Sequence, residues 1–403
     1  MSTILVIGGG PAGMTAAYAA SDSGRNRVIL VERNEETGKK LLLTGSGKCN
    51  YSNANLDPKY YNFGANHPFA NLLNRYDTAW LEEFFAKRGM LTDRRDGLLY
   101  PQSERSDTVR DLLTDLLKEA KVETITGRKA VKAHCEGRFT VEFEDGTSIL
   151  ADKLIIATGG KAYPSTGSDG GGYRLARNLG HEVTFTYPVL TRLLTSDEQT
   201  GKMAGVRIRA KVTGTVDGET AETTEGEVQF NSNALSGICI FQLSRFLSKP
   251  LEEGKDCHVH IDFAPGMTEA ETINFIKEAG KTRTGASLSG IVDTMFGTKT
   301  AEMLIDKAAE YEGISKDKIT AEQVAHFIKD TDVKIDNHDS FRDAQVTRGG
   351  VKLDEVNENM ESKITKNLYF AGEVLDVDGT CGGYNLHFAF VSGYEAGLSA
   401  AGD

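Results

Sequence analysis

Three glycines near the start of the chain have the spacing of a nucleotide-binding turn. Gly8, Gly10 and Gly13 follow the apolar run 4–7 and precede a segment of small residues, 14–20, that is expected to be helical. In such a turn the first glycine permits the tight bend, the second lets the backbone approach a pyrophosphate, and the third lets the helix pack against the strand. The helix start offers free N–H groups and a positive dipole end to that pyrophosphate.

An acidic residue follows at the position that a nucleotide site requires. Glu32 ends a second apolar run, 28–31, and lies 19 residues after Gly13. A carboxylate there can accept hydrogen bonds from an adenosine ribose. The strand, turn, helix, strand and acid therefore occur in the order of a dinucleotide site. The motif by itself does not choose between NAD and FAD.

Three more glycine-rich segments, 38–53, 157–172 and 371–385, have the composition of ligand-binding loops. With the turn at 8–13 they make four segments, and three of the four begin at the ends of apolar strands. Ligands of open parallel sheets bind outside the carboxyl ends of the strands. We therefore expect the four segments to converge on one extended ligand.

Longer motifs carry a resemblance to a known family. The strand ends at 157–159 and 369–373 resemble the second and third FAD fingerprints of glutathione-reductase-type flavoproteins. The chain also resembles the BaiN-like family of bacterial NAD(P)/FAD-dependent oxidoreductases in five runs: GKKLLLTGSGKCN from residue 38, LLYPQS from 98, YPSTG from 163, GEVLDVDG from 372 and GGYNL from 382. The similarity covers nearly the whole chain. It implies FAD, bound non-covalently, and hydride transfer through flavin N5.

The resemblance implies FAD contacts in or next to all four segments, at the end of the second apolar run and in one strand of a small meander. These residues are Gly8, Gly10, Pro11, Ala12, Gly13, Glu32, Arg33, Lys39, Lys40, Ser46, Gly47, Lys48, Cys49, Asn50, Val131, Ala157, Thr158, Gly159, Gly160, Gly372, Glu373, Asp376, Asp378, Gly379, Gly383, Tyr384, Asn385 and Leu386.

The resemblance also implies which part of FAD some of these residues would contact. Glu32 would hold the adenosine ribose, and the backbone of Val131 would pair with the adenine edge. The segment 46–50 would pass beside the isoalloxazine. Asp376 or Asp378 would meet the ribityl or pyrophosphate region.

Helix dipole and lysine charge add two further expectations. The start of the final helix, at 383–385, would point at flavin N1 and C2=O and stabilise the negative charge of reduced flavin. Lys39 and Lys40 either contact a phosphate or ribose or belong to a solvated loop. Lys48 lies in a glycine-walled loop and is expected beside the flavin.

Candidates for reactive side chains have a structural alternative in each case. Tyr163, Tyr384 and His387 are candidate proton donors near the flavin, because tyrosine and histidine can serve as general acids. Packing and ordinary hydrogen bonding are the alternative for all three. Cys49 is expected to be a small buried residue rather than a nucleophile. Cys381, where the family usually has another residue type, either has a functional role or is a loop residue.

Two other patterns also allow a chemical and a structural interpretation. The run 168–172 forms either a second anion cradle, for NAD(P)H or substrate, or a structural turn. His258 and His260 share one face of a strand. No further His or Cys pair lies near them at ligand spacing, so we expect no metal site.

The bulk composition limits the partners. The 403 residues carry a net charge of −12, which argues against nucleic acid or an anionic membrane as the main partner and leaves a small-molecule substrate. The sequence contains neither a run of about eighteen apolar residues nor a basic leader, so we expect no membrane span or signal peptide. The five cysteines are scattered without a C-x-x-C pair, which fits a reducing cytoplasm and excludes dithiol reductase chemistry.

These patterns predict an α/β fold. A Rossmann-like FAD-binding domain, with a parallel sheet and a small antiparallel meander, is interrupted by a β-barrel-like subdomain and a helical subdomain. The expected boundaries are 1–188 and 340–403 for the two parts of the FAD domain, 189–264 for the barrel-like insert and 265–339 for the helical insert. The insert is expected to cover the flavin and to form the substrate pocket.

The predicted function is an FAD-dependent oxidoreductase. The family resemblance implies an NAD(P)H-linked reductase of a small hydrophobic substrate with an activated C=C bond, such as a steroid-like bile acid intermediate. No complete second Rossmann fingerprint occurs, so a nicotinamide nucleotide binds transiently at the flavin face or another donor is used. The alternatives are a flavin amine oxidase that uses O₂, an RNA-modifying flavoenzyme, which the negative charge disfavours, and a non-catalytic FAD-binding redox module.

Overall fold

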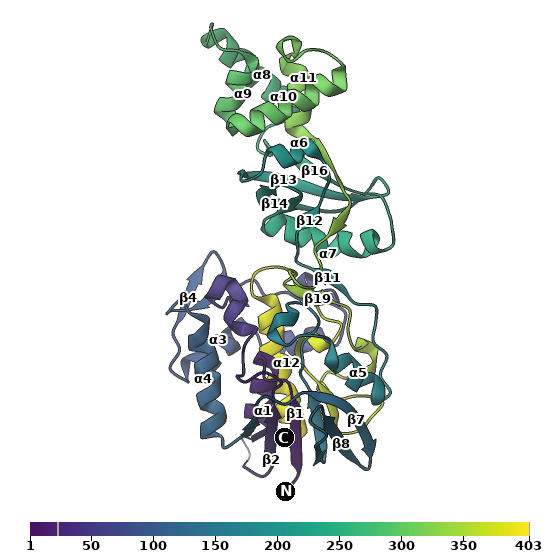
Figure 1. The fold of residues 1–403 in the computed structure, drawn as a ribbon. Coiled ribbons are helices and arrows are strands. Elements are labelled where there is room, and N and C mark those ends of the chain that lie inside the picture. The colour runs from purple at the N-terminus through teal and green to yellow at the C-terminus, as the bar shows by residue number, and fades with distance from the viewer. Residues whose placement is uncertain (22–23, 403) are drawn as a thin grey trace. The chain divides into compact units, whose positions relative to one another are not determined.

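The chain folds into two units, each with its own hydrophobic core. The structure is a computed structural model that describes residues 1–21 and 24–402. The first unit combines Met1–Tyr187 with the segment from Gln345 to the C-terminal end, and the second unit is Pro188–Ala344 (Figure 1). Within the described residues no helix is both long and apolar enough to cross a bilayer.

A five-stranded parallel sheet is the centre of the first unit. Its strand order is β20–β10–β1–β2–β6. The strands are β1 (Thr3–Ile7), β2 (Arg27–Val31), β6 (Glu123–Ile125), β10 (Lys153–Ile156) and β20 (Leu368–Phe370). β20 comes from the C-terminal segment, and its Tyr369 lies opposite Ile155 of β10. Continuous apolar runs predicted β1, β2, β10 and β20, and such runs are typical of a parallel sheet that is covered on both faces. β6, with the sequence ETI, was not predicted.

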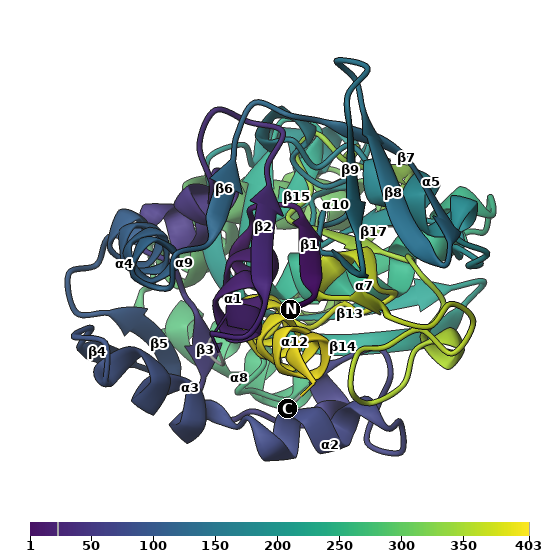
Figure 2. The same cartoon turned by 90° about the horizontal axis from the view of Figure 1, so that it is seen from below.

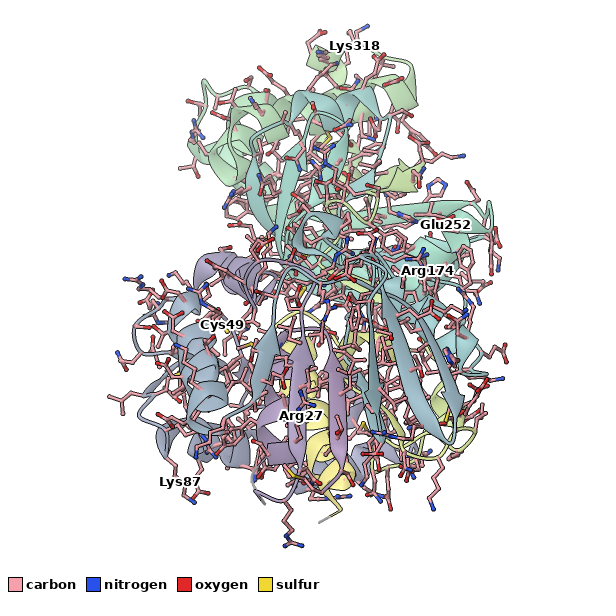
Figure 3. The ribbon with its side chains drawn as sticks, turned by 60° about the horizontal axis from the view of Figure 1, so that its bottom comes forward. Arg27, Cys49, Lys87, Arg174, Glu252 and Lys318 are labelled. Atoms are coloured by element: carbon pink, nitrogen blue, oxygen red, sulfur yellow. The ribbon has the colours of Figure 1, made fainter. Side chains whose placement is uncertain are left out.

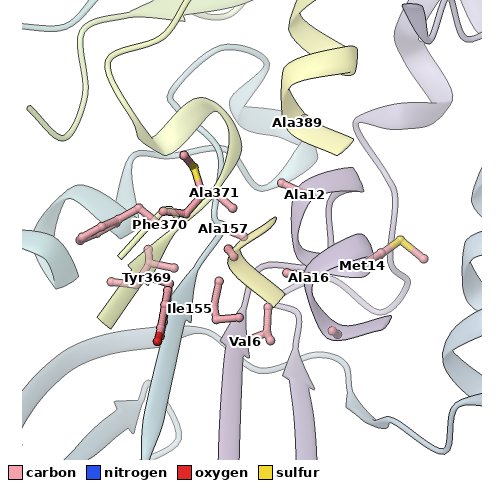
Figure 4. Packing of buried hydrophobic residues seen from close by; sticks show 14 of the residues in the cluster. Val6, Ala12, Met14, Ala16, Ile155, Ala157, Tyr369, Phe370, Ala371 and Ala389 are labelled. Carbon is pink, nitrogen blue, oxygen red and sulfur yellow. The ribbon is translucent and has the colours of Figure 1, made fainter. Parts of the chain in front are cut away.

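Two helices from opposite ends of the sequence pack together on this sheet. They are α1 (Pro11–Ser21) and α12 (Tyr384–Ala401), which lie side by side in Figure 2. Figure 4 shows Ala12 of α1 close to Ala389 of α12 and to the buried residues of the sheet. Gly393 permits the close approach, because a Cβ atom there would collide with the carbonyl oxygen of Ala12. The first and last segments of the chain therefore share one core.

The remaining elements of the first unit surround the sheet. The predicted meander is an antiparallel sheet of β7 (Ala130–Glu136), β8 (Arg138–Phe143) and β9 (Ser148–Ala151). A second small antiparallel sheet contains β3 (Ser52–Asn53), β4 (Thr92–Arg95) and β5 (Leu98–Pro101). The other helices are α2 (Phe69–Arg75), α3 (Thr78–Ala86), α4 (Ser106–Glu119) and α5 (Gly171–Asn178). Short 3₁₀ helices are η1 (Leu41–Gly47), η2 (Pro58–Tyr60), η3 (Pro164–Thr166), η5 (Leu353–Glu355) and η6 (Gly372–Val374).

The second unit contains a seven-stranded antiparallel sheet with the order β17–β16–β13–β14–β15–β12–β18. Its strands are β12 (Leu193–Leu194), β13 (Arg207–Val216), β14 (Glu219–Asn231), β15 (Ala234–Ser236), β16 (Cys257–Asp262), β17 (Thr331–Ile335) and β18 (Asn337–His338). Its helices are α6 (Glu198–Lys202), α7 (Ile238–Glu252), α8 (Glu269–Thr282), α9 (Leu288–Phe296), α10 (Thr298–Glu312), η4 (Lys316–Lys318) and α11 (Ala321–Lys329). α7 lies inside the segment 189–264 that was predicted to be β-barrel-like, and its Leu243 and Leu247 belong to the core of this unit. The division of the insert into two subdomains stays a prediction.

The chain leaves the first unit at β11 (Tyr187–Val189) and returns at β19 (Val346–Arg348). These two short strands pair with each other. All residues of the predicted FAD site belong to the first unit, so this unit contains the site that is described next.

Candidate functional site

The turn between β1 and α1 has two glycines that the protein's own packing requires and one that it does not. Gly8 has a φ of +108°, and a Cβ atom there would collide with the carbonyl oxygen of Ala157. A Cβ atom on Gly13 would collide with the carbonyl oxygen of Gly8. At Gly10, by contrast, a Cβ atom would meet no heavy atom of the described protein within 4 Å. Open space at this position, beside the start of α1, is what a bound pyrophosphate needs.

Glu32 is held at the end of β2 by three hydrogen bonds to its carboxylate. The backbone N–H of Gly9 donates to Oε2 at 2.6 Å, and the backbone and side-chain nitrogens of Asn34 donate to Oε1 at 2.8 and 2.7 Å. The same Asn34 side chain donates to the carbonyl of Thr166 at 2.9 Å. The predicted ribose-binding acid is therefore fixed against the glycine turn and connected to the segment 157–172.

The two lysines that follow Glu32 have different surroundings. Lys40 is partly buried, and its Nζ lies 2.7 Å from Oε2 of Glu373 in the last glycine segment. Lys39 is exposed. The other oxygen of Glu373 accepts a hydrogen bond from the backbone of Thr347 at 2.8 Å. Of the two predicted phosphate or ribose contacts, Lys40 is the one that the fold places among the other predicted residues.

The loop 41–50 departs from helical geometry where the flavin contacts were predicted. Gly45, Ser46 and Gly47 have φ values of +57°, +55° and +85°, and Cys49 has a φ of +58°. At Gly47, as at Gly10, a Cβ atom would meet open space. The Lys48 ammonium lies 2.7 Å from Oε2 of the partly exposed Glu104. The backbone of Lys48 thus lies in the predicted flavin loop, directly after Gly47, whereas its ammonium group pairs with a carboxylate at the surface.

The Cys49 side chain, which Figure 3 labels, is completely buried. Burial raises the pKa of its thiol to about 12, although a hydrogen bond with Thr44 lowers it slightly. Only the thiolate is a nucleophile. Cys49 therefore has the environment of a structural cysteine, in agreement with the favoured interpretation of the sequence.

Asn50 connects the second glycine segment to the last one. With its amide nitrogen donating to the carbonyls of Ser52 and Leu99, at 2.9 and 3.1 Å, its oxygen accepts from the N–H of Gly383 at 3.2 Å. Gly383 has a φ of +92° and precedes α12 directly, and a Cβ atom there would collide with the carbonyl of Ser52. The start of α12, with its positive dipole end, thus lies against the loop that was predicted to border the isoalloxazine.

The segment 157–172 is positioned by the C-terminal part of the chain. A Cβ atom on Gly160 would lie 2.7 Å from Cβ of Thr347. The Thr347 hydroxyl accepts hydrogen bonds from the backbone N–H groups of Lys161 and Ala162, at 2.7 and 2.9 Å. Thr158 is tightly packed as well, because a Cβ atom on Gly172 would lie 3.0 Å from its Cβ. These contacts account for Gly160, shortly after β10, and for Gly172 in α5.

The run 168–172 has the geometry of a turn. Asp169 Oδ1 accepts a hydrogen bond from the N–H of Gly171, the first residue of α5, at 3.0 Å. A carboxylate of the chain therefore already lies at the start of this helix. Of the two interpretations of this run, the structural turn is the one that the contacts favour.

Two aspartates of the last segment lie in different electrostatic environments. Asp376 accepts hydrogen bonds from Thr184 Oγ1 at 2.9 Å and from the N–H of Gly349 at 3.1 Å. Burial raises its pKa despite these bonds. Asp378 is completely buried and lies 3.3 Å from the guanidinium of Arg348. Asn385, the second residue of α12, holds the turn that follows Asp378 through two hydrogen bonds to the backbone of Gly379, at 2.8 and 3.0 Å.

The three proton-donor candidates differ in their availability. His387 is completely buried, with Nδ1 2.9 Å from Ser52 Oγ and Nε2 2.9 Å from the carbonyl of Tyr76. Burial lowers its pKa to about 4, so the ring is neutral at pH 7. The Tyr384 hydroxyl donates to the carbonyl of Asn55 at 3.2 Å, and burial raises its pKa. Tyr163 is half-buried in a left-handed conformation before η3.

Val131 lies where the meander is irregular. The β7–β8 register passes from Ala130–Phe143 to Lys132–Glu142, so Val131 has no partner residue in this ladder. A β-bulge of this kind leaves a residue outside the regular pairing. This geometry fits a backbone that pairs with an adenine edge.

Sequence reasoning missed several side chains that hold the predicted loops together. Asn62 donates to the carbonyl of Asp376 at 3.0 Å and accepts from the N–H of Asp378 at 3.0 Å. Asn34, Thr184, Thr347 and Arg348 make the other contacts named above. Only Asn34, two residues after Glu32, had a local signal, since Asn is frequent in turns.

The pair of histidines that was considered for metal binding, His258 and His260, lies in the second unit. The Nδ1 atoms of His258 and His260 are 2.7 Å from Asp332 and 2.8 Å from Asp330. Among the residues that the structure describes, no group of three or more His, Cys, Asp or Glu side chains has the arrangement of a metal site.

The sequence matches the family model described as HI0933-like protein Rossmann domain over residues 2–399. It is 36% identical to 3-dehydro-bile acid delta(4,6)-reductase of Clostridium scindens, over 100% of this chain and 99% of that protein. It is 27% identical to ribosomal RNA dihydrouridine synthase of Escherichia coli, over 97% of this chain and 96% of that protein. The ribosomal RNA dihydrouridine synthase of Haemophilus influenzae is 26% identical, over 98% and 97% of the two chains.

Proposed function

This chain belongs to the HI0933-like Rossmann-domain family, and we propose that it is a reductase that takes hydride from NADH or NADPH and adds it, by way of FAD, to a carbon–carbon double bond conjugated with a carbonyl group. It is an FAD-dependent oxidoreductase that is related over its whole length to a reductase. FAD, when bound, supplies hydride transfer at its N5 atom.

One observation carries this proposal: the 36% identity to the bile acid reductase extends over essentially both complete chains. The names of that relative and of the two ribosomal RNA relatives all describe the reduction of a carbon–carbon double bond, in a bile acid and in uridine respectively. This shared chemistry supports C=C reduction as the reaction of the site, independently of the substrate.

The chain's own residues support binding and orientation of the cofactor. The open space at Gly10 and Gly47 and the N–H groups at the start of α1 suit a pyrophosphate and a flat ring system close to the backbone. The start of α12, fixed by Asn50 and Asn385, brings a positive dipole end to the same loops. A fixed dipole of this sign favours the negative charge of a reduced flavin.

A small, apolar, steroid-like acceptor is our first choice of substrate. Uridine in RNA is the second, because two relatives are named ribosomal RNA dihydrouridine synthases. Charge favours the first choice: the insert 188–344 holds 26 Asp and Glu residues against 18 Lys and Arg residues. Nucleic acid binding depends on neutralising phosphates with basic side chains, so an acidic insert disfavours RNA.

The test is an anaerobic titration of the purified yellow protein with NADH and with NADPH, followed by mixing of the reduced protein with one acceptor at a time. The acceptors are a 3-oxo-Δ4 bile acid, a uridine-containing oligoribonucleotide and O₂. We expect the flavin absorbance to be bleached by a nicotinamide nucleotide and restored fastest by the bile acid.

The other outcomes would exclude the proposed function or favour a different one. Failure of both nucleotides to bleach the flavin would exclude the nicotinamide-linked reductase. Fast recovery with the oligoribonucleotide would favour the RNA substrate. Bleaching by an amine in place of NAD(P)H, with fast recovery in O₂, would favour an amine oxidase.

A further inference from the structure

The first unit has a cavity of about 330 Å³ beside the predicted ribose-binding acid. It is lined by Arg33, Gly127, Arg128, Lys129, Glu144 and Asp145. The cavity adjoins Glu32 on two sides, because Arg33 is the next residue and the N–H of Arg128 donates to the carbonyl of Glu32 at 2.9 Å. Its volume falls at the lower end of the range of small-molecule sites, about 300–1,000 Å³.

The cavity has three cationic walls, but each cation has a carboxylate partner. Arg33 lies 2.6 Å from Asp169, Arg128 lies 3.0 Å from Asp145, and Lys129 lies 3.3 Å from Asp169. Because its cations are already paired with carboxylates, the cavity is not an anion-binding site. It suits a neutral, polar-edged group such as a nucleoside, which agrees with a lining that includes Arg33, next to Glu32, and Lys129, two residues before Val131.

Asp169 is the residue that connects two of these walls. Its Oδ2 atom contacts both Arg33 and Lys129, which come from the end of β2 and from the segment before β7. Its Oδ1 atom caps Gly171. Arg33 also donates to the carbonyl of Gly167 at 3.0 Å, in the same turn as Asp169. We call Asp169, Arg33 and Lys129 the Asp169 cluster.

We propose that Asp169 is a positioning residue for the adenosine end of FAD, because it holds Arg33 and Lys129 as fixed walls of this cavity. The inference rests on the proposed flavin function and adds a residue outside the predicted cofactor contacts. Side chains that are fixed before binding lose no rotamer freedom when the ligand arrives, and this preorganisation increases affinity. The cluster is only partly exposed, with 24–34% of each side chain accessible, so its ion pairs are incompletely screened by water.

Asp169→Asn is the appropriate test, because it removes the charge and keeps an oxygen that can cap Gly171. We expect the FAD dissociation constant of the apoprotein to rise about tenfold and that of ADP, which lacks the flavin, to rise by a similar factor. The weakening of FAD binding between low and high salt should be smaller in the variant than in the wild type. The matched control is Asp115→Asn, which removes an exposed ion pair with Lys118 on α4.

A second variant checks that the effect passes through the cluster. Lys129→Met should weaken FAD binding by itself but add little in combination with Asp169→Asn, since neighbours that act together are not additive. An unchanged FAD dissociation constant in a folded Asp169→Asn protein would overturn the positioning role alone. Weakened FAD binding with unchanged ADP binding would overturn its assignment to the adenosine end. A wild-type protein that binds no FAD would overturn the proposed function as well.

Discussion

Lys39 and Lys40 are adjacent residues of one type, but Lys40 is partly buried against Glu373, another predicted site residue, whereas Lys39 is exposed. Lys40→Met should raise the FAD dissociation constant about fivefold to tenfold, or roughly 1–1.4 kcal/mol. The reason is electrostatic: without Lys40, the partly buried carboxylate of Glu373 keeps its charge beside the expected phosphates. Fluorescence titration of the apoprotein measures this effect.

Lys39→Met is the control and should bind FAD like the wild type, because Lys39 is exposed. Equal losses in both variants would refute the distinction.

His387 gives the protein a defined response to acid. Its pKa is about 4 in the folded chain and about 6.5 in an unfolded chain. The unfolded state therefore binds more protons between these values, so stability is present above pH 6.5 and is lost as the pH falls toward 4. From pH 7 to pH 5 this group should remove about 2 kcal/mol of the free energy of unfolding.

Urea unfolding of the apoprotein at pH 7 and pH 5 tests this response. His387→Gln loses the titrating group, so its stability should be lower at pH 7 but should change less between the two pH values. The matched control is His134→Gln, which should keep the wild-type pH dependence because His134 is only half-buried on β7. A His387→Gln protein with the full wild-type pH dependence would show that other groups are responsible.

At the scale of elements, the contact between α1 and α12 is sensitive to added side-chain volume. Gly393→Ala should destabilise the protein by about 2–3 kcal/mol, because the added methyl group meets the backbone of Ala12, which cannot rotate away. Thermal and urea unfolding measure the loss. Ser399→Ala, in the last turns of the same helix, should change stability by less than about 0.5 kcal/mol. A Gly393→Ala protein of wild-type stability would mean that the two helices can separate at little cost.

The elements also show what local sequence can and cannot predict. The glycine-ended strands β1, β10 and β20 were predicted correctly, because apolar runs and glycine spacing are local signals of a buried strand and a tight turn. α7 was missed, since it lies between alternating segments and its own pattern was not separated from theirs. Local periodicity alone does not distinguish a single helix that lies between strands of a β-rich insert.

The candidate site was predicted in its glycines and acids but not in the contacts that assemble it. Asn62 reaches Asp376 and Asp378, more than 300 residues further along the chain, and Thr347 reaches the backbone at 161–162. Such bonds depend on the tertiary fold and leave no spacing in the sequence. The same holds for Asp169, whose pairing with Arg33 spans 136 positions.

At the scale of the whole molecule, the two cores do not share residues. The larger cluster draws its buried members from 4–179 and 351–400, and the second draws its members from 193–335. The predicted FAD residues all lie in the unit that contains the first cluster. Cofactor binding and the chemistry contributed by the insert are therefore expected to be separable.

Excision of the insert tests this separation. β11 and β19 pair where the chain leaves and re-enters the first unit, so a Gly-Ser linker from Tyr187 to Gln345 is the natural place for the deletion. We expect the shortened protein to fold and to bind FAD with a dissociation constant within about fivefold of the full chain, or roughly 1 kcal/mol.

Its reduction of the acceptor in the anaerobic assay should fall to the background rate, because the insert is expected to form the substrate pocket. The controls are circular dichroism and FAD fluorescence of both proteins. A shortened protein that binds FAD and still reduces the acceptor at the full rate would place the whole substrate site in the first unit, whereas one that folds without binding FAD would show that the insert contributes to the cofactor site.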